Sequence, residues 1–228
     1  MNCKLIEIGQ IEKTKFGILD IPRHYWPEMG QYLPCQNLTR DTSRLPIHLI
    51  KIVSPENILC LGPLPDDWQP GDDLILLPPQ GKGFKLPPSA RRVGLLTLST
   101  SPIYLLTLTE AALAQGSSIS LFCETIPSKG LLNHVPSRVE VTHISSLTEN
   151  LDWPDFLAFD IAHHELETLS SLFTGSELPF EGQVLIRTPM PCRGLGDCGV
   201  CAVKTPSGWR YACKDGPVFP LSEVLHVA

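Results

Sequence analysis

The stretch VGLLTLSTSPIYLLTLTEAALAQGSSISLFC, residues 93–123, contains the pattern that decides the fold. It opens with Val93–Leu98, a mostly apolar run of the kind found in buried strands. Ile103–Gln115 then has helical periodicity and ends before Gly116, a residue favoured just past the C-terminus of a helix. Ser118–Cys123 is a second strand candidate. The stretch therefore predicts a strand–helix–strand unit, in which the two strands are parallel.

The chain after this unit continues the same alternation. Further strands are predicted at Val139–Ile144, Phe156–Ile161 and Gln183–Thr188, and Ala162–Leu172 is the best helix candidate. We expect a small parallel sheet with crossover helices over residues 91–188.

The residues before the unit have a different pattern, in which short strands are separated by turn residues. This spacing favours a small antiparallel β-barrel over residues 1–90. The predicted strands are Cys3–Gln10, Lys15–Ile21, Ile47–Val53, Ile58–Leu61 and Asp73–Leu77.

The remaining tail, residues 189–228, contains four cysteines separated by five, two and eleven residues. A cysteine, a short loop, a Cys-x-x-Cys pair and a distant cysteine is the plant-type [2Fe-2S] arrangement. Gly194, Gly196 and Gly199 suit such a loop, because they allow positive φ and let N–H groups point at the sulfurs. We therefore predict a [2Fe-2S] cluster, whose ligands are Cys192, Cys198, Cys201 and Cys213.

Two other interpretations of the tail stay open. Structural zinc also takes four thiolates, but zinc sites usually present two short knuckles and this chain has one Cys-x-x-Cys. Ordinary thiols or a disulfide pair would leave the glycines unexplained. The other cysteines are scattered singly and are predicted to be reduced thiols without chemistry; they are Cys3, Cys35, Cys60 and Cys123.

The composition narrows the class of protein. The net charge is −6 and no basic run occurs, which argues against a nucleic-acid partner. The first residues lack the features of a signal peptide, and no apolar run approaches the roughly eighteen residues of a membrane span. We expect a cytoplasmic protein.

The order of barrel, parallel α/β layer and cysteine tail resembles the electron-transfer subunit of class B dihydroorotate dehydrogenase, a relative of the ferredoxin reductases. The resemblance rests on Met190–Cys201, on Cys213–Phe219, and on the barrel exit at Pro70–Leu74 and Pro79–Phe84. It implies a flavin-binding-like barrel (1–90), a NAD-binding-like α/β domain (91–188) and a cluster-binding tail (189–228). It also implies that the four tail cysteines are the cluster ligands and that a catalytic flavoprotein is the partner.

Two nucleotide motifs of that family are altered in this chain. The flavin motif, Arg-x-aromatic-Ser, corresponds to Arg44–Ile47, where Arg44 is still a candidate partner of an FAD phosphate but the aromatic and hydroxyl groups are absent. The glycine-rich turn is replaced by LTLSTSP, whose Ser99, Thr100 and Ser101 are predicted to cap the next helix. The sequence thus argues against FAD, and more strongly against NAD.

Two shorter motifs have structural interpretations. Gly81–Phe84 is predicted to be the turn that leads from the barrel to the sheet. His163 and His164 are predicted to be a solvated helix start, because adjacent helical residues point about 100° apart and rarely share a metal.

Together these features predict an iron–sulfur electron-transfer subunit that relays single electrons to or from a redox partner in a hetero-oligomer. One alternative is an FAD-containing, NADH-dependent reductase subunit with atypical nucleotide pockets. The other is a structural or assembly subunit whose tail is stapled by zinc or by a cluster.

Overall fold

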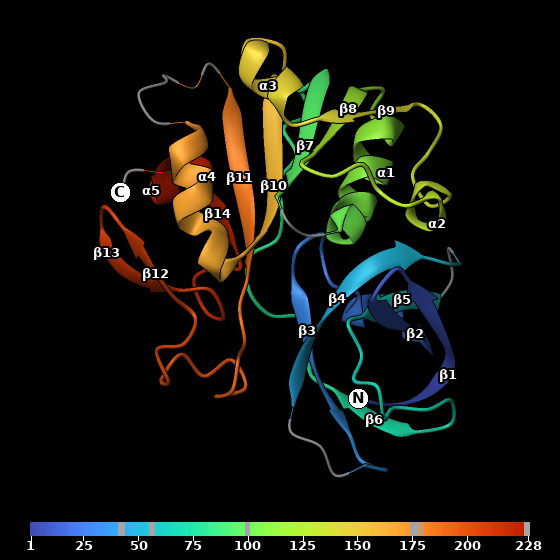
Figure 1. Cartoon of the computed structure of the whole chain (residues 1–228). Coiled ribbons are helices and arrows are strands. Elements are labelled where there is room, and N and C mark those ends of the chain that lie inside the picture. The colour runs from blue at the N-terminus through green and yellow to red at the C-terminus, as the bar shows by residue number, and fades with distance from the viewer. Residues whose placement is uncertain (41–43, 55–57, 99–100, 174–177, 179, 226–228) are drawn as a thin grey trace.

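The structure is a computed structural model that describes residues 1–40, 44–54, 58–98, 101–173, 178 and 180–225. It consists of a closed antiparallel β-barrel, a mostly parallel sheet with helices on both faces, and a tail with a small hairpin (Figure 1). The predicted fold class is confirmed. The domain boundaries at residues 90 and 188 stay predictions.

The barrel closes in the strand order β1-β2-β5-β4-β3-β6. Strand β3 was not predicted, and it contains Pro34, which has no N–H group to donate to the ladder. Pro34 lies opposite Pro46 of β4, so the two missing donors fall at one place in the ladder. The strands are β1 Asn2–Ile11, β2 Thr14–Asp20, β3 Tyr32–Asn37, β4 Leu45–Ile52, β5 Ile58–Gly62 and β6 Asp73–Leu76, with a short helix η1 at Arg23–Tyr25.

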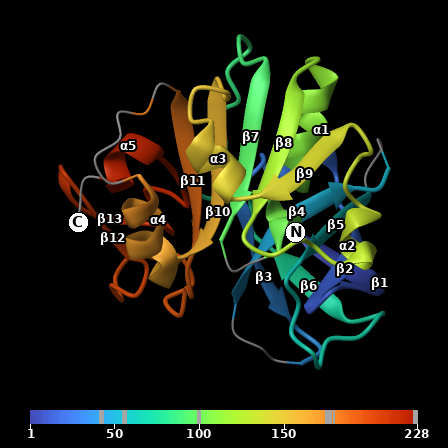
Figure 2. The ribbon, with the colours of Figure 1, turned by 45° about the horizontal axis from the view of Figure 1, so that its top comes forward.

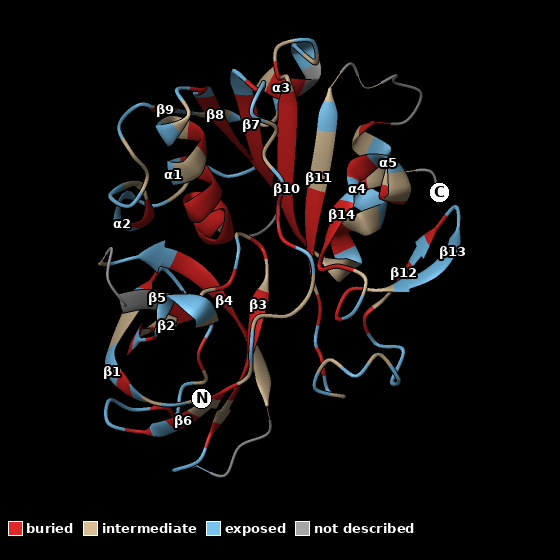
Figure 3. Cartoon of the chain, turned by 180° about the vertical axis from the view of Figure 1, so that it is seen from behind, coloured by how far each residue is buried: buried red, intermediate tan, exposed pale blue. Residues whose placement is uncertain are grey.

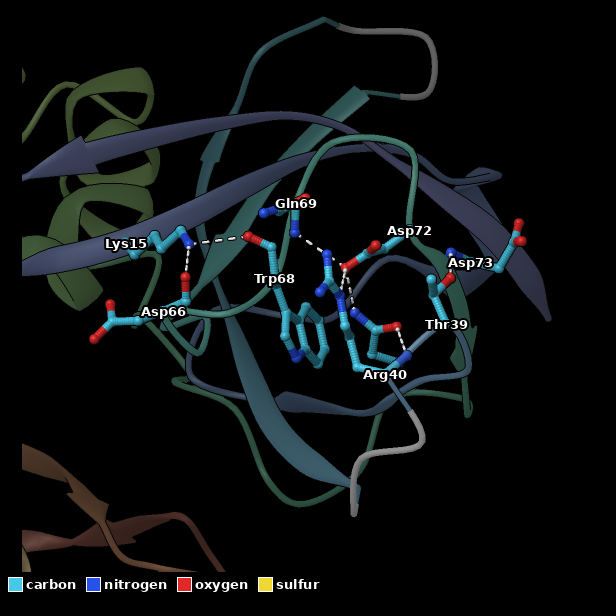
Figure 4. A network of polar contacts seen from close by, with 9 residues as sticks. Lys15, Thr39, Arg40, Asp66, Trp68, Gln69, Asp72 and Asp73 are labelled. Atoms are coloured by element: carbon cyan, nitrogen blue, oxygen red, sulfur yellow. Dashed lines mark hydrogen bonds and ion pairs between the residues drawn. The ribbon is translucent and has the colours of Figure 1, made fainter.

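A buried carboxylate holds the loop that enters β6. Asp72 is 4% exposed, and its Oδ2 accepts hydrogen bonds from Asn37 Nδ2 at 2.6 Å, from the Gln69 N–H at 3.0 Å and from Arg40 Nε at 3.3 Å (Figure 4). Burial raises the pKa of Asp72, but these hydrogen bonds outweigh it and hold the pKa below its usual value. The Pro70–Leu74 motif at the barrel exit therefore has a structural role, because its Asp72 fixes the loop that enters β6.

The second layer is a sheet in the order β14-β11-β10-β7-β8-β9, in which only β14 is antiparallel to its neighbour. Its predicted strands are confirmed to within two residues, but β14 was not predicted. The strands are β7 Arg92–Thr97, β8 Ser118–Cys123, β9 Val139–His143, β10 Phe156–Ala162, β11 Glu181–Arg187 and β14 Val218–Pro220.

The two predicted helices each begin with a short 3-10 turn. Gly116 has φ +83° and ends the first of them, as predicted. Pro102–Leu105 (η2) precedes α1 at Leu106–Ala114, and His163–Glu165 (η3) precedes α4 at Leu166–Leu172. The other helices are α2 Lys129–Leu132, α3 Ser145–Glu149 and α5 Leu221–Val224.

Side chains of the sheet alternate between two apolar cores, as the two-residue period of strands requires. Val93 and Phe156 face the core shared with α1, whereas Leu96 and Phe159 face the core shared with α4 and α5. Figure 2 shows the sheet between these helices, and Figure 3 shows that its central strands are buried while the tail hairpin is largely exposed. The second core also contains tail cysteines, so the tail is packed onto the sheet. Among the described residues, no helix has the length and hydropathy needed to cross a membrane.

We expect Asp72→Ala to lower the free energy of unfolding by about 2–4 kcal/mol, because it removes the acceptor of the buried Asn37 amide and the partner of the Arg40 guanidinium. Asp73→Ala is the matched control. Its side chain is 59% exposed and pairs with Lys4 at the surface, so we expect a loss below about 0.5 kcal/mol. Urea denaturation followed by circular dichroism measures both changes, and equal losses would contradict the role of Asp72.

Candidate metal centre

The four tail cysteines are arranged as two pairs. The Sγ atoms of Cys192 and Cys198 lie within 4.8 Å of each other and of an Asp197 carboxylate oxygen, at the more exposed end of the loop. Cys201 and Cys213 are 1% and 2% exposed, and their Sγ atoms are 3.2 Å apart. The tail therefore contains one pair of thiols near the solvent and a second pair in the core.

A hairpin explains the long gap between the last two cysteines. Strands β12 (Ala202–Thr205) and β13 (Gly208–Tyr211) pair in antiparallel register and return the chain to its starting point. The Ala212 N–H then donates to the Cys201 carbonyl at 2.9 Å, which places Cys213 beside Cys201.

The glycines of the loop have the conformations that the sequence predicts. Gly194, Gly196 and Gly199 have φ of +84°, +75° and +73°, in the left-handed region that favours glycine. The first part of the loop bends back so that three successive backbone N–H groups, of residues 196–198, donate to the Cys192 sulfur. Such a nest of N–H groups stabilises an anionic sulfur.

The two ends of the site differ in their electrostatics. Burial raises the pKa of Cys192, but the Cys198 thiol and the N–H groups outweigh it and lower the pKa to about 7. Burial and the neighbouring Cys201 raise the pKa of Cys213 to about 12. Two adjacent buried thiols become thiolates only with a cation between them. The donor set, four sulfurs with inward N–H groups, fits an iron–sulfur cluster.

Several contacts attach the tail to the rest of the protein, in addition to the pairing of β14 with β11. The Tyr32 hydroxyl of β3 donates to the Cys213 carbonyl at 2.8 Å, and a backbone bridge joins Lys82 to Pro217. Nε2 of His163 lies 2.7 Å from the Ala202 carbonyl oxygen. His163 begins η3 as predicted but is half-buried because its ring contacts the tail, whereas His164 is exposed. Gly81–Phe84 does turn, with φ +77° at Gly81, and it also pairs with the tail.

The position of the altered flavin motif is a shallow depression between the barrel and the tail. Arg44 and Pro46 line one side and Met190 and Arg193 the other, around an empty volume of about 170 Å³ that includes open solvent. Nε of Arg44 is buried and makes no hydrogen bond within the described part of the chain. Its role as a phosphate partner stays a prediction.

The carboxyl ends of β7 and β10, where the strand order reverses, are where ligands bind in such sheets. Here four side chains of the chain itself lie close together at this edge of the sheet. Asp160 is fully buried and accepts from Arg187 Nε at 2.6 Å, and the Arg187 guanidinium lies 5.0 Å from the Tyr104 ring centre. The ring of His48, from the barrel, meets Tyr104 edge-on at 5.5 Å. These four residues form the seam cluster between barrel and sheet.

The charges of the seam cluster are balanced internally. Burial raises the pKa of Asp160 to about 6 despite Arg187, which lowers it, so Asp160 is ionised and paired near neutral pH. Burial and the nearby guanidinium lower the pKa of His48 to about 4, so His48 is neutral there.

A barrel carboxylate reaches the neighbouring end of the sheet. Glu12 lies in the turn after β1, and its Oε1 accepts from the Ser128 N–H at 3.2 Å.

The predicted cap residues Ser99 and Thr100 lie outside the described residues. Ser101 occupies the N-cap position of η2, as predicted, but its side chain makes no capping hydrogen bond.

Comparison with known proteins finds matches to the cysteine tail. Residues 188–225 match the family model described as the iron-sulfur cluster binding domain of dihydroorotate dehydrogenase B. The chain is 45% identical over 42 residues to the sulfhydrogenase 1 subunit gamma of Pyrococcus furiosus, a match that covers 18% of the chain and only 14% of that protein.

Two longer likenesses extend over most of the chain. The electron transfer subunit of dihydroorotate dehydrogenase B (NAD(+)) from Clostridium perfringens is 27% identical over 171 residues, which cover 68% of this chain and 67% of the relative. A solved NADH-dependent reduced ferredoxin-NADP oxidoreductase has a TM-score of 0.73 at 17% identity, covering 97% of this chain and 89% of that one, which supports the fold.

The fold and the cysteine tail together define an iron–sulfur electron-transfer subunit on a ferredoxin-reductase-like scaffold, as predicted. Over most of its length, the chain is similar to the electron-transfer subunits of dihydroorotate dehydrogenase B.

We expect Cys201→Ser to abolish the visible absorbance of the cluster, because Cys201 supplies a buried thiolate that serine replaces poorly. Cys3→Ser is the control: Cys3 is partly exposed on β1, so its hydroxyl can reach water and the absorbance should persist. Absorbance spectra and iron content of the anaerobically purified variants measure the difference. Equal losses would remove Cys201 from the ligand set.

Proposed function

We propose that the chain holds a [2Fe-2S] cluster on Cys192, Cys198, Cys201 and Cys213 and relays single electrons to or from a partner oxidoreductase. The observation that supports this proposal most strongly is the division of the thiols into two pairs. A cluster with two irons needs two thiolates at each end. The paired geometry supplies one exposed and one buried end for it.

The same geometry argues against zinc. Four sulfurs about 2.3 Å from one tetrahedral zinc would all lie within about 4 Å of one another. Among the described residues, the only group of three or more metal-binding side chains within 4.8 Å is Cys192, Asp197 and Cys198. Cys201 and Cys213 form their own pair outside this group, as an elongated cluster requires.

We further propose that the chain binds neither FAD nor NAD at the positions where the family resemblance implies these two sites. Ligand pockets usually measure about 300–1,000 Å³, more than the depression beside Arg44 provides. The seam cluster of His48, Tyr104, Asp160 and Arg187 lies at the edge where such a sheet would bind a dinucleotide. A single cluster with no second redox centre relays nothing by itself, so we propose a hetero-oligomer with a redox protein such as a flavoprotein dehydrogenase. We retain the prediction of a cytoplasmic location.

Anaerobic purification of the full chain, followed by iron, sulfide, zinc and flavin analysis, tests the proposal. We expect about two irons and two sulfides per chain, and a paramagnetic signal after one-electron reduction with dithionite. Stoichiometric zinc in a colourless protein would replace the relay with a structural subunit.

Flavin analysis separates the proposal from the reductase alternative. We expect no stoichiometric FAD and no reduction of the cluster by NADH alone. If FAD is found, Arg44→Ala tests its phosphate partner, and reduction by NADH would overturn our assignment of a relay without nucleotide sites.

A further inference from the structure

We propose that Tyr32 of the barrel is a positioning residue for the cluster, which holds the Cys213 peptide in place and sets the reduction potential of the cluster. This inference rests on the proposed function, because it requires a cluster on the tail cysteines.

The first support is a buried hydrogen bond between residues far apart in the chain. Tyr32 is 1% exposed, and its hydroxyl donates to the Cys213 carbonyl at 2.8 Å. The same hydroxyl lies 3.2 Å from Gln80 Oε1. A tyrosine hydroxyl has one proton to donate, and the shorter contact directs it to Cys213.

The cysteine loop also closes over this hydroxyl from its other end. A Cβ atom added at Gly194 would lie 2.7 Å from the Tyr32 hydroxyl oxygen and 3.1 Å from Gln80 Oε1. Only glycine permits so close an approach at φ +84°. The hydroxyl is thus enclosed between the first turn of the loop, two residues after Cys192, and Cys213 itself.

Tyr32 stays a neutral donor at this place. A tyrosine hydroxyl has an ordinary pKa of about 10, so it is protonated near neutral pH. The hydroxyl therefore presents a fixed O–H dipole to a group of sulfurs that become anionic when metal binds.

The barrel keeps this dipole from following the loop. Tyr32 exchanges two backbone hydrogen bonds with Gln80, at 3.2 and 2.9 Å, and pairs with His48 across the β3–β4 ladder. Its ring packs 6.2 Å from that of His48, which belongs to the seam cluster. The backbone and ring of Tyr32 are consequently anchored in the barrel.

The sign of the effect follows from the direction of the bond. The positive end of the O–H dipole points at the Cys213 carbonyl oxygen and reduces its negative potential at the sulfurs. Reduction adds negative charge to the cluster, and hydrogen bonds near the sulfurs favour the reduced form. Loss of the hydroxyl should therefore lower the reduction potential.

Redox titration of the cluster in Tyr32→Phe, followed by electron paramagnetic resonance, tests the inference. We expect the ratio of reduced to oxidised cluster at a fixed potential to fall about threefold to tenfold, the effect of one buried hydrogen bond. Tyr104→Phe is the matched control, because it removes a buried hydroxyl from the same seam without contact to the cysteines. An unchanged potential in Tyr32→Phe, or equal shifts in both variants, would overturn the inference.

A second comparison does not depend on the folding of Tyr32→Phe. Gly194→Ala and Gly199→Ala introduce the same left-handed strain, but only the Cβ atom at position 194 meets Tyr32, since Gly199 has nothing within 4 Å. We expect the larger change in potential from Gly194→Ala, and partial reversal of it when Tyr32→Phe is added. Equal changes at the two glycines would contradict the contact.

The two proposals fail in different ways. Absence of iron and sulfide from the unaltered chain would overturn the proposed function. A normal cluster whose potential ignores Tyr32 and Gly194 would overturn this inference alone.

Discussion

The packing of the tail depends on two buried thiols. The Sγ atoms of Cys201 and Cys213 lie 3.2 Å apart in the core. Burial and mutual proximity make thiolates at this place unfavourable, as the raised pKa of Cys213 indicates. A cation reverses that preference, because it compensates the charge of both sulfurs. Binding of metal and packing of the tail are therefore coupled steps, and the hairpin that unites the two cysteines is the element through which they are coupled.

The seam between barrel and sheet follows a different rule. In a scaffold of this kind, the switch point of the strands is usually left open for a ligand. Here Arg187 and Asp160 form an ion pair, and Tyr104 and His48 pack beside it, although Arg187 Nη2 and Asp160 Oδ2 have no hydrogen-bond partner among the described residues. A buried ion pair gives little net stability but penalises every arrangement that separates its partners. The seam cluster thus fixes how the barrel meets the sheet.

The parts of this structure that could be predicted are those whose signal is local. Apolar runs identified the sheet strands, and the glycines around the cysteines identified the loop, because both depend on neighbouring residues. Strand β3 was missed because Pro34 violates strand propensity, and only its position opposite Pro46 makes the violation tolerable. The seam cluster was missed because its members come from four separate elements. One signal was available for it: Asp160 interrupts the apolar strand Phe156–Ala162, and a charge inside such a run requires a partner.

The asymmetry of the cysteine site connects these features to electron transfer. Cys198 is exposed and Cys192 partly so, while Cys201 and Cys213 face the core and the barrel. An electron exchanged with a partner has the shortest route through the exposed end. The buried end, where Tyr32 and the hairpin meet the sulfurs, is shielded from that partner and from water. The partner can then contact the exposed end of the cluster, while hydrogen bonds at the buried end set the reduction potential. These two roles can be separated because solvent exposure and hydrogen bonds to sulfur affect the potential independently. The barrel then contributes directly to the cluster site, because it supplies the fixed Tyr32 hydroxyl that the short tail does not contain.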